Sequence, residues 1–283
     1  MASIEIEGAR IACTQTGAGE SVLLLHSSAS SSAQWRSLAE SLQDSHRVVA
    51  PDFFGYGETD PWPGRGPFSL AEEAALADSV VPAGAGRIHV IGHSYGAAVA
   101  LRYALDRPGR LRSLTLIEPV AFHLIRNAQA GSPDARLFQE VAALAALVWK
   151  AATRGDYAGA MARFVDYWNG EGAWSKLEPG AQAVLSRRVP KLSLDFWAAL
   201  METADPGGYA RISAPCLILR GSHSPQPVKR IAELVCDLLP AARLETINGA
   251  GHMLPLTHKA AVSAAVLAQL ARQTAGRRRR LVA

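Results

Sequence analysis

Residues 92–96 are Gly-His-Ser-Tyr-Gly. A serine with a glycine two residues before it and two residues after it is the pattern in this chain that most strongly indicates a catalytic residue. Residues 88–91 are mostly apolar and β-branched, which is typical of a short buried strand. Residues 97–103 begin a helical pattern that ends at Pro108. A strand, a sharp turn and a helix in this order expose the hydroxyl of Ser94 at the positive end of a helix. The glycines fit because a side chain at either position would strike the adjacent backbone. The pattern therefore indicates a nucleophilic serine.

A serine hydroxyl becomes a good nucleophile only when a base takes its proton and a third group orients that base. Of the eight histidines, His252 is the best candidate base, because it lies in a glycine-rich loop after the last predicted strand. His46 and His89 belong to predicted strands, where a structural role is expected. The side chain of His93 is expected to point away from Ser94.

The rest of the chain must position these groups, and its apolar segments alternate with helical patterns. Segments of strand length occur at residues 22–25, 47–50, 113–117, 216–219 and 244–247. This alternation predicts an α/β fold with a mostly parallel central sheet and helices on both faces. Ligands of such sheets bind at the carboxyl ends of the strands.

Residues 121–210 differ from their surroundings, because they contain amphipathic helical patterns and no strand-like segment. Four of the six tryptophans lie in this block. We interpret it as a helical cap that contributes to a partly apolar substrate pocket. Residues 1–120 and 211–276 then form the core, and residues 277–283 form a basic tail that is expected to be disordered.

Composition limits the classes of function. The formal charge of the 283 residues is +4, and Arg277–Arg280 account for all of it. Residues 1–276 therefore have no net charge, which argues against nucleic-acid binding. No apolar run is long enough to span a membrane, and the first residues do not resemble a secretory signal. Three scattered cysteines are expected to be reduced. We expect a cytoplasmic protein, and a homodimer stays open.

These motifs resemble the α/β-hydrolase-fold serine hydrolases over essentially the whole chain. The resemblance is carried by residues 25–26, 51–57, 92–96 and 249–252. The family order of nucleophile, acid and histidine is satisfied by Ser94, Glu118 and His252. No metal or other cofactor is implied, because the sequence contains neither metal-ligand spacing nor a phosphate-binding loop.

The acid departs from the usual pattern of this family. Most capped relatives have an aspartate in a Gly-x-x-Asp turn, where this chain has Ser224. In other relatives the acid follows the strand after the elbow, and Glu118 occupies that position. Asp52 and Asp205 are weaker candidates. We expect Glu118 to be the third member of a triad.

The resemblance also implies an oxyanion hole made of two backbone N–H groups. One should come from Tyr95, directly after the nucleophile, and the other from Ser28. Because Ser27 replaces the usual glycine after the histidine, the choice between the Ser27 and Ser28 amides stays open. The residues expected to bind substrate are His26, Ser27, His123, Trp149 and Trp168.

The resemblance predicts hydrolysis of a carboxylic ester or thioester of a small to medium, partly apolar molecule through an acyl-enzyme. The expected partner is therefore a small-molecule ester or acyl substrate, with neither nucleic acid nor a membrane. Two alternatives stay open: a carbon–carbon bond hydrolase of an aromatic-degradation pathway, and a non-catalytic ligand-binding homologue. A serine nucleophile argues against dehalogenase and epoxide hydrolase chemistry, for which relatives use aspartate.

Overall fold

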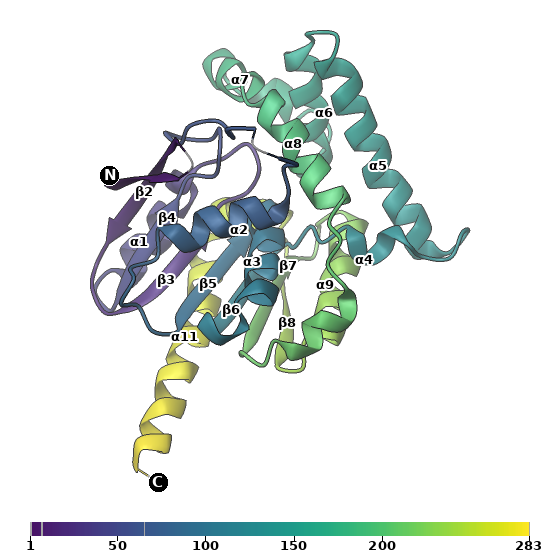
Figure 1. Cartoon of the computed structure of the whole chain (residues 1–283). Helices are drawn as coiled ribbons and strands as arrows, with labels where there is room; N and C mark the ends of the chain where they lie inside the picture. The colour runs from purple at the N-terminus through teal and green to yellow at the C-terminus, as the bar shows by residue number, and fades with distance from the viewer. Residues whose placement is uncertain (1, 7, 65, 283) are drawn as a thin grey trace.

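A single sheet forms the centre of the computed structural model, which describes residues 2–6, 8–64 and 66–282 (Figure 1). The eight strands in these ranges follow the order β1-β2-β4-β3-β5-β6-β7-β8. The pairs β1–β2 and β2–β4 are antiparallel, and every other neighbouring pair is parallel. The predicted mostly parallel sheet is therefore confirmed. The strands are β1 Ala2–Ile6, β2 Ala9–Thr16, β3 Glu20–Leu25, β4 His46–Pro51, β5 Ile88–His93, β6 Leu111–Ile117, β7 Cys216–Gly221 and β8 Ala242–Ile247.

Helices cover both faces of this sheet. In β3, Leu23 and Leu25 belong to one apolar core, whereas Val22 and Leu24 belong to the other. Successive side chains of a strand point to opposite faces, so a strand covered on both faces is apolar throughout. The first face is covered by α2 Leu70–Ser79, α3 Tyr95–Asp106 and α9 Gln226–Leu238, and the second by α1 Arg36–Leu42 and α11 Lys259–Val282.

The closing helix α11, yellow in Figure 1, extends well beyond the sheet. The sequence predicted a disordered tail over residues 277–283, whereas the structure continues α11 through residue 282, and residue 283 lies outside the described residues. Alanine and arginine, which are frequent in this segment, are both good helix formers. Within the described ranges, no helix combines the length and the apolar character needed to cross a bilayer.

A group of helices separates β6 from β7 and lies beyond the carboxyl ends of the parallel strands (Figure 1). We call these helices, over residues 123–200, the helical insertion; they lie in the segment that the sequence assigns to a cap. The first long helix is capped by Ser132, whose hydroxyl accepts a hydrogen bond from the N–H of Ala135 at 3.1 Å. The helices of the insertion are α4 His123–Arg126, α5 Pro133–Ala152, α6 Tyr157–Asn169, α7 Pro179–Ser186 and α8 Val189–Leu200.

Short helices complete the chain. They are the single turn α10 Leu254–Thr257 and the 3₁₀ segments Ser32–Trp35, Pro108–Arg110, Trp174–Lys176 and Pro206–Arg211.

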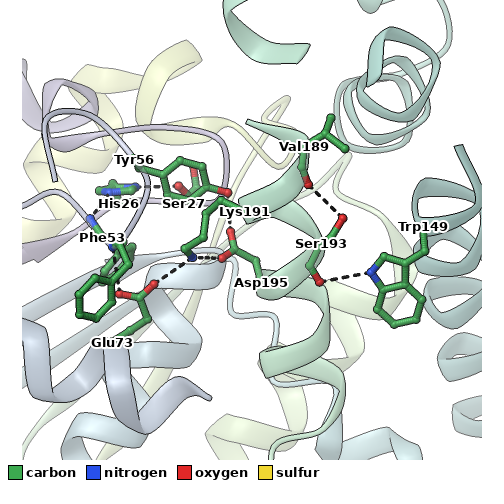
Figure 2. A network of polar contacts seen from close by, with 11 residues as sticks. His26, Ser27, Phe53, Tyr56, Glu73, Trp149, Val189, Lys191, Ser193 and Asp195 are labelled. Atoms are coloured by element: carbon green, nitrogen blue, oxygen red, sulfur yellow. Dashed lines mark hydrogen bonds and ion pairs between the residues drawn. The ribbon is translucent and has the colours of Figure 1, made fainter. Parts of the chain in front are cut away.

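A buried charge cluster joins the helical insertion to the core, as Figure 2 shows. Lys191 of α8 is 7% exposed and pairs with Glu73 of α2 at 2.9 Å and with Asp195 one turn further along α8. Asp195 also accepts a hydrogen bond of 2.7 Å from the hydroxyl of Tyr56. Burial alone would lower the pKa of Lys191, but the carboxylates of Asp195 and Glu73 raise it above its ordinary value. Burial raises the pKa of Glu73 to about 7.

Replacing Lys191 with methionine is expected to lower the free energy of unfolding by about 3–5 kcal/mol, because buried carboxylates lose their counter-charge. Chemical denaturation followed by circular dichroism measures this change. Glu233→Ala is the control, because Glu233 is partly exposed and forms surface ion pairs with Arg220 and Arg230, so its loss should cost less than about 1 kcal/mol. Adding Glu73→Gln to the Lys191 variant should recover part of the loss. A Lys191 variant as stable as the wild type would contradict this role.

Candidate active site

Ser94 lies in the sharp turn between β5 and α3. Its backbone has φ 55° and ψ −115°, and its N–H donates to the carbonyl of Ile117 at 2.8 Å. A Cβ atom on Gly92 would lie 2.2 Å from the carbonyl oxygen of Gly96, and one on Gly96 would lie 2.2 Å from that of Leu25. Both glycines are therefore required by the close approach of three backbone segments.

The structure brings Ser94, His252 and Glu118 into one hydrogen-bonded line. The Oγ of Ser94 lies 2.9 Å from Nε2 of His252, and Nδ1 of His252 lies 2.9 Å from Oε2 of Glu118. Ser94 and Glu118 directly follow β5 and β6, and His252 lies in the loop after β8, at the positions that the sequence indicated. All three are buried, and the side chain of Glu118 is fully so.

The Glu118 carboxylate is fixed from the neighbouring strand. Its Oε1 accepts a hydrogen bond of 2.6 Å from the N–H of Gly221, while its own N–H donates to the carbonyl of Leu219 at 2.8 Å. A Cβ atom on Gly221 would lie 2.3 Å from the carbonyl oxygen of Ala250, so a side chain there would push these loops apart. Ser224, at the position where the sequence comparison with capped hydrolases would place an acid, is buried nearby.

The two weaker acid candidates have other partners. Asp52 accepts hydrogen bonds from the N–H groups of Ser32 at 2.6 Å and Glu58 at 3.0 Å, and so fixes a loop. Asp205 caps a 3₁₀ segment by accepting from the N–H of Gly207 at 3.1 Å.

The loop after β3 presents backbone donors next to Ser94. The N–H and the hydroxyl of Ser27 both donate to Oε1 of Gln34, at 3.2 and 2.8 Å. Among the described residues, no hydrogen-bond acceptor is present for the N–H groups of Ser28 and Tyr95. The guanidinium of Arg188, from the start of α8, donates to the carbonyl of Ala29.

Gln34 also connects this loop to the loop of His252. Its Nε2 donates to Nδ1 of His93 at 3.2 Å, and Nε2 of His93 donates to the carbonyl of His252 at 2.9 Å. Burial lowers the pKa of His93 to about 3, so its ring is neutral and can both accept and donate. The side chain of His93 is therefore turned to the backbone of His252. Sequence reasoning missed Gln34, because nothing near it in the chain indicates a partner 59 residues away.

Two cavities meet at Ser94. The smaller, which we call the inner cavity, has a volume of about 20 Å³ and reaches Tyr95 and Asp195. The larger, which we call the outer cavity, has a volume of about 360 Å³ and reaches Ser27, His252 and Leu256. Both are lined by Ser28, Ser94, Phe164 and Trp168.

Of the five residues predicted to bind substrate, Trp168 and Ser27 line these cavities. Trp168 stacks on the ring of His252, with centroids 4.2 Å apart and planes at 28°. Phe164 was missed, although it lies four residues before Trp168 and hence on the same face of α6.

The structure places the other three predicted substrate-binding residues in packing positions. The ring of His26 is fully buried; its Nδ1 donates to the carbonyl of Ser27 at 2.8 Å and its Nε2 accepts from the N–H of Phe53 at 3.0 Å (Figure 2). His123 pairs with the hydroxyl of Tyr209 at 2.9 Å. Burial lowers the pKa of both histidines to about 4. Trp149 donates from Nε1 to the carbonyl of Ser193 at 3.2 Å, which joins α5 to α8.

Known proteins with similar sequences include hydrolases. An uncharacterized protein of Mycobacterium tuberculosis strain H37Rv is 26% identical over 257 residues, which cover 87% of this chain and 74% of the relative. Lipase LipV of the same organism is 35% identical over 120 residues, which cover 40% of this chain and 44% of the lipase.

The fold is similarly matched among solved structures. The crystal structure of a hydrolase from Pseudomonas aeruginosa PA01 aligns with a TM-score of 0.71 and 26% identity, covering 95% of this chain and 97% of that one. Residues 20–259 match a family model described as alpha/beta hydrolase fold. With this match over most of its length, the chain belongs to the alpha/beta hydrolase fold family.

Proposed function

We propose that this protein is a serine hydrolase that cleaves a carboxylic ester or thioester of a small to medium, partly apolar molecule through an acyl-enzyme. The observation that carries the proposal is the line of hydrogen bonds from Ser94 through His252 to Glu118 beside two cavities. The similarity of 120 residues to Lipase LipV agrees with this chemistry.

In the first step His252 acts as the base. The carboxylate of Glu118 accepts from Nδ1–H, which leaves the lone pair of Nε2 facing the Ser94 hydroxyl 2.9 Å away. As Oγ attacks the carbonyl carbon, its proton moves to Nε2, and the Glu118 carboxylate stabilises the imidazolium.

The negative oxygen of the tetrahedral intermediate requires donors. The N–H of Tyr95, at the first residue of α3, and that of Ser28 are proposed for this role, since the Ser27 N–H is engaged by Gln34. The intermediate then collapses: the bond to the leaving group breaks, and the leaving group takes the proton from His252. Water, deprotonated by His252, hydrolyses the acyl-enzyme and restores Ser94.

A serine-directed fluorophosphonate is expected to add one label to each wild-type protein chain, because the Ser94 hydroxyl faces a base. Intact-mass measurement gives the stoichiometry, and Ser94→Ala should abolish it. Ser222→Ala is the control, because the Ser222 hydroxyl accepts a hydrogen bond from Gly249 outside the cavities. A folded wild-type protein that stays unlabelled would identify a non-catalytic binder.

Glu118→Gln is expected to lower kcat for a reactive ester by about 10⁴-fold, because an amide in this position favours the wrong imidazole tautomer. Glu118→Asp should also lower kcat, since its shorter side chain does not reach Nδ1. Glu58→Gln, in an exposed loop, is the control and should keep wild-type kcat. Full activity of folded Glu118→Gln would assign the third group to another residue.

Gln34→Leu is expected to lower kcat by up to about 100-fold with little change in KM, because it releases both the Ser27 loop and His93. Steady-state kinetics on a p-nitrophenyl ester separate the two constants. Gln182→Leu, whose side chain bonds only the carbonyl of Trp174, is the matched control. Equal kcat for the Gln34 variant and the wild type would rule out this positioning role.

A further inference from the structure

The two cavities differ in which parts of the reaction they contact. Among the described lining residues, His252 lines the outer cavity and not the inner one, whereas Tyr95 lines the inner cavity and not the outer one. Phe164 and Trp168 line both, and their rings pack edge-to-face with centroids 6.2 Å apart. They therefore form the partition between the cavities, with Ser94 at the opening where both meet.

A substrate carbonyl at Ser94 must place one substituent on each side of this partition. The leaving group takes its proton from His252, so it has to lie on the side that His252 lines, which is the outer cavity. The acyl group stays bound to Ser94 and occupies the other side. We infer that the inner cavity holds the acyl group and that the outer cavity holds the alcohol or thiol. This inference rests on the proposed function.

The size of the inner cavity limits the acyl group to a few carbons. Its volume of about 20 Å³ is close to the minimum that a single water molecule needs. Its walls are closely packed, because Phe122, Leu192, Phe196 and Ala199 are each less than 5% exposed. The ring of Phe196 also packs against Phe164, with centroids 5.9 Å apart.

The carboxylate at the wall of the inner cavity disfavours an anionic acyl group. Asp195 lines this cavity, and its two oxygens are already bonded to Lys191 and to the hydroxyl of Tyr56. A second carboxylate beside it would be repelled and would have no cation left to pair with. The acyl group that fits is therefore very short and uncharged, such as acetyl or propionyl.

The outer cavity has the opposite properties. Its volume of about 360 Å³ is in the range of drug-sized ligand sites. None of its described lining residues is a lysine, arginine, aspartate or glutamate. Its apolar lining includes Met161, Val165, Leu177, Leu185, Met253 and Leu256. The substrate class is therefore a short-chain acyl ester or thioester of a bulky, apolar, uncharged alcohol or thiol.

Two isomeric esters test this orientation directly. Octyl acetate and ethyl octanoate contain the same atoms and differ only in the side of the carbonyl that bears the long chain. We expect kcat/KM for octyl acetate to exceed that for ethyl octanoate by about 100-fold or more, because several methylenes fit one cavity and not the other. Equal values, or a preference for ethyl octanoate, would overturn the assignment.

Variants in each cavity provide the second readout. Phe196→Ala should enlarge the inner cavity and raise kcat/KM for ethyl octanoate, relative to that for octyl acetate, by about tenfold or more. Leu185→Trp should narrow the outer cavity and raise KM for octyl acetate but not for ethyl acetate. Phe138→Ala, on α5 outside both cavities, is the matched control. If the Phe196 variant does not fold, Ala199→Leu should lower cleavage of ethyl propionate relative to ethyl acetate. Unchanged ratios in the folded variants would overturn the inference.

The outcomes separate this inference from the proposed function. If the protein reacts with the fluorophosphonate and cleaves esters but prefers ethyl octanoate, the hydrolase function stands and the assignment of the acyl group to the inner cavity is wrong. If the protein neither reacts with the fluorophosphonate nor cleaves esters, both the proposed function and the assignment of the cavities are wrong.

Discussion

The geometry of the candidate site depends on backbone conformations that L-amino acids rarely adopt. Among the described residues, three other than glycine have positive φ: Ala29 at 53°, Ser94 at 55° and Glu118 at 53°. Each such residue costs about 1–3 kcal/mol, so the surrounding structure must hold it in place. Ser94 and Glu118 are held by hydrogen bonds to Ile117 and Leu219, and Ala29 by the guanidinium of Arg188. The strain is therefore concentrated in the loops that meet at the end of the sheet.

Helix α8 connects stability to recognition. Within its first two turns Lys191 pairs with a carboxylate of the core, Leu192 and Asp195 line the inner cavity, and Arg188, immediately before the helix, bonds the loop after β3. A change in how this helix packs would move the cavity wall and the loop together. For this reason, substitutions that alter specificity along α8 are also expected to alter stability.

The sequence allowed the sheet and the meeting of Ser94, His252 and Glu118 to be predicted, because local patterns carry this information. A glycine-flanked serine between a strand and a helix has few conformations available. An acid directly after a buried parallel strand must lie at the carboxyl end of the sheet. The strand order was not predicted, since it depends on crossovers that leave no local pattern.

Side-chain directions were harder to predict within the helical insertion and its borders. Trp149 and Trp168 look alike in the sequence, but one bonds a neighbouring helix and the other faces His252. His26 and His123 flank strands as expected, and yet both are buried in packing contacts. Such differences depend on how helices rotate against one another, which amphipathic spacing does not specify.

The stacking of Trp168 on His252 bears on the electrostatics of the proposed reaction. The indole covers one face of the imidazole and keeps bulk water from it, which lowers the local dielectric and strengthens attraction to the Glu118 carboxylate. When the ring becomes positively charged, the electron-rich indole face is itself an attractive partner through a cation–π contact. In the proposed reaction, a residue of the helical insertion would thus help to stabilise charge in the core, and opening of this layer would change the chemistry as well as access.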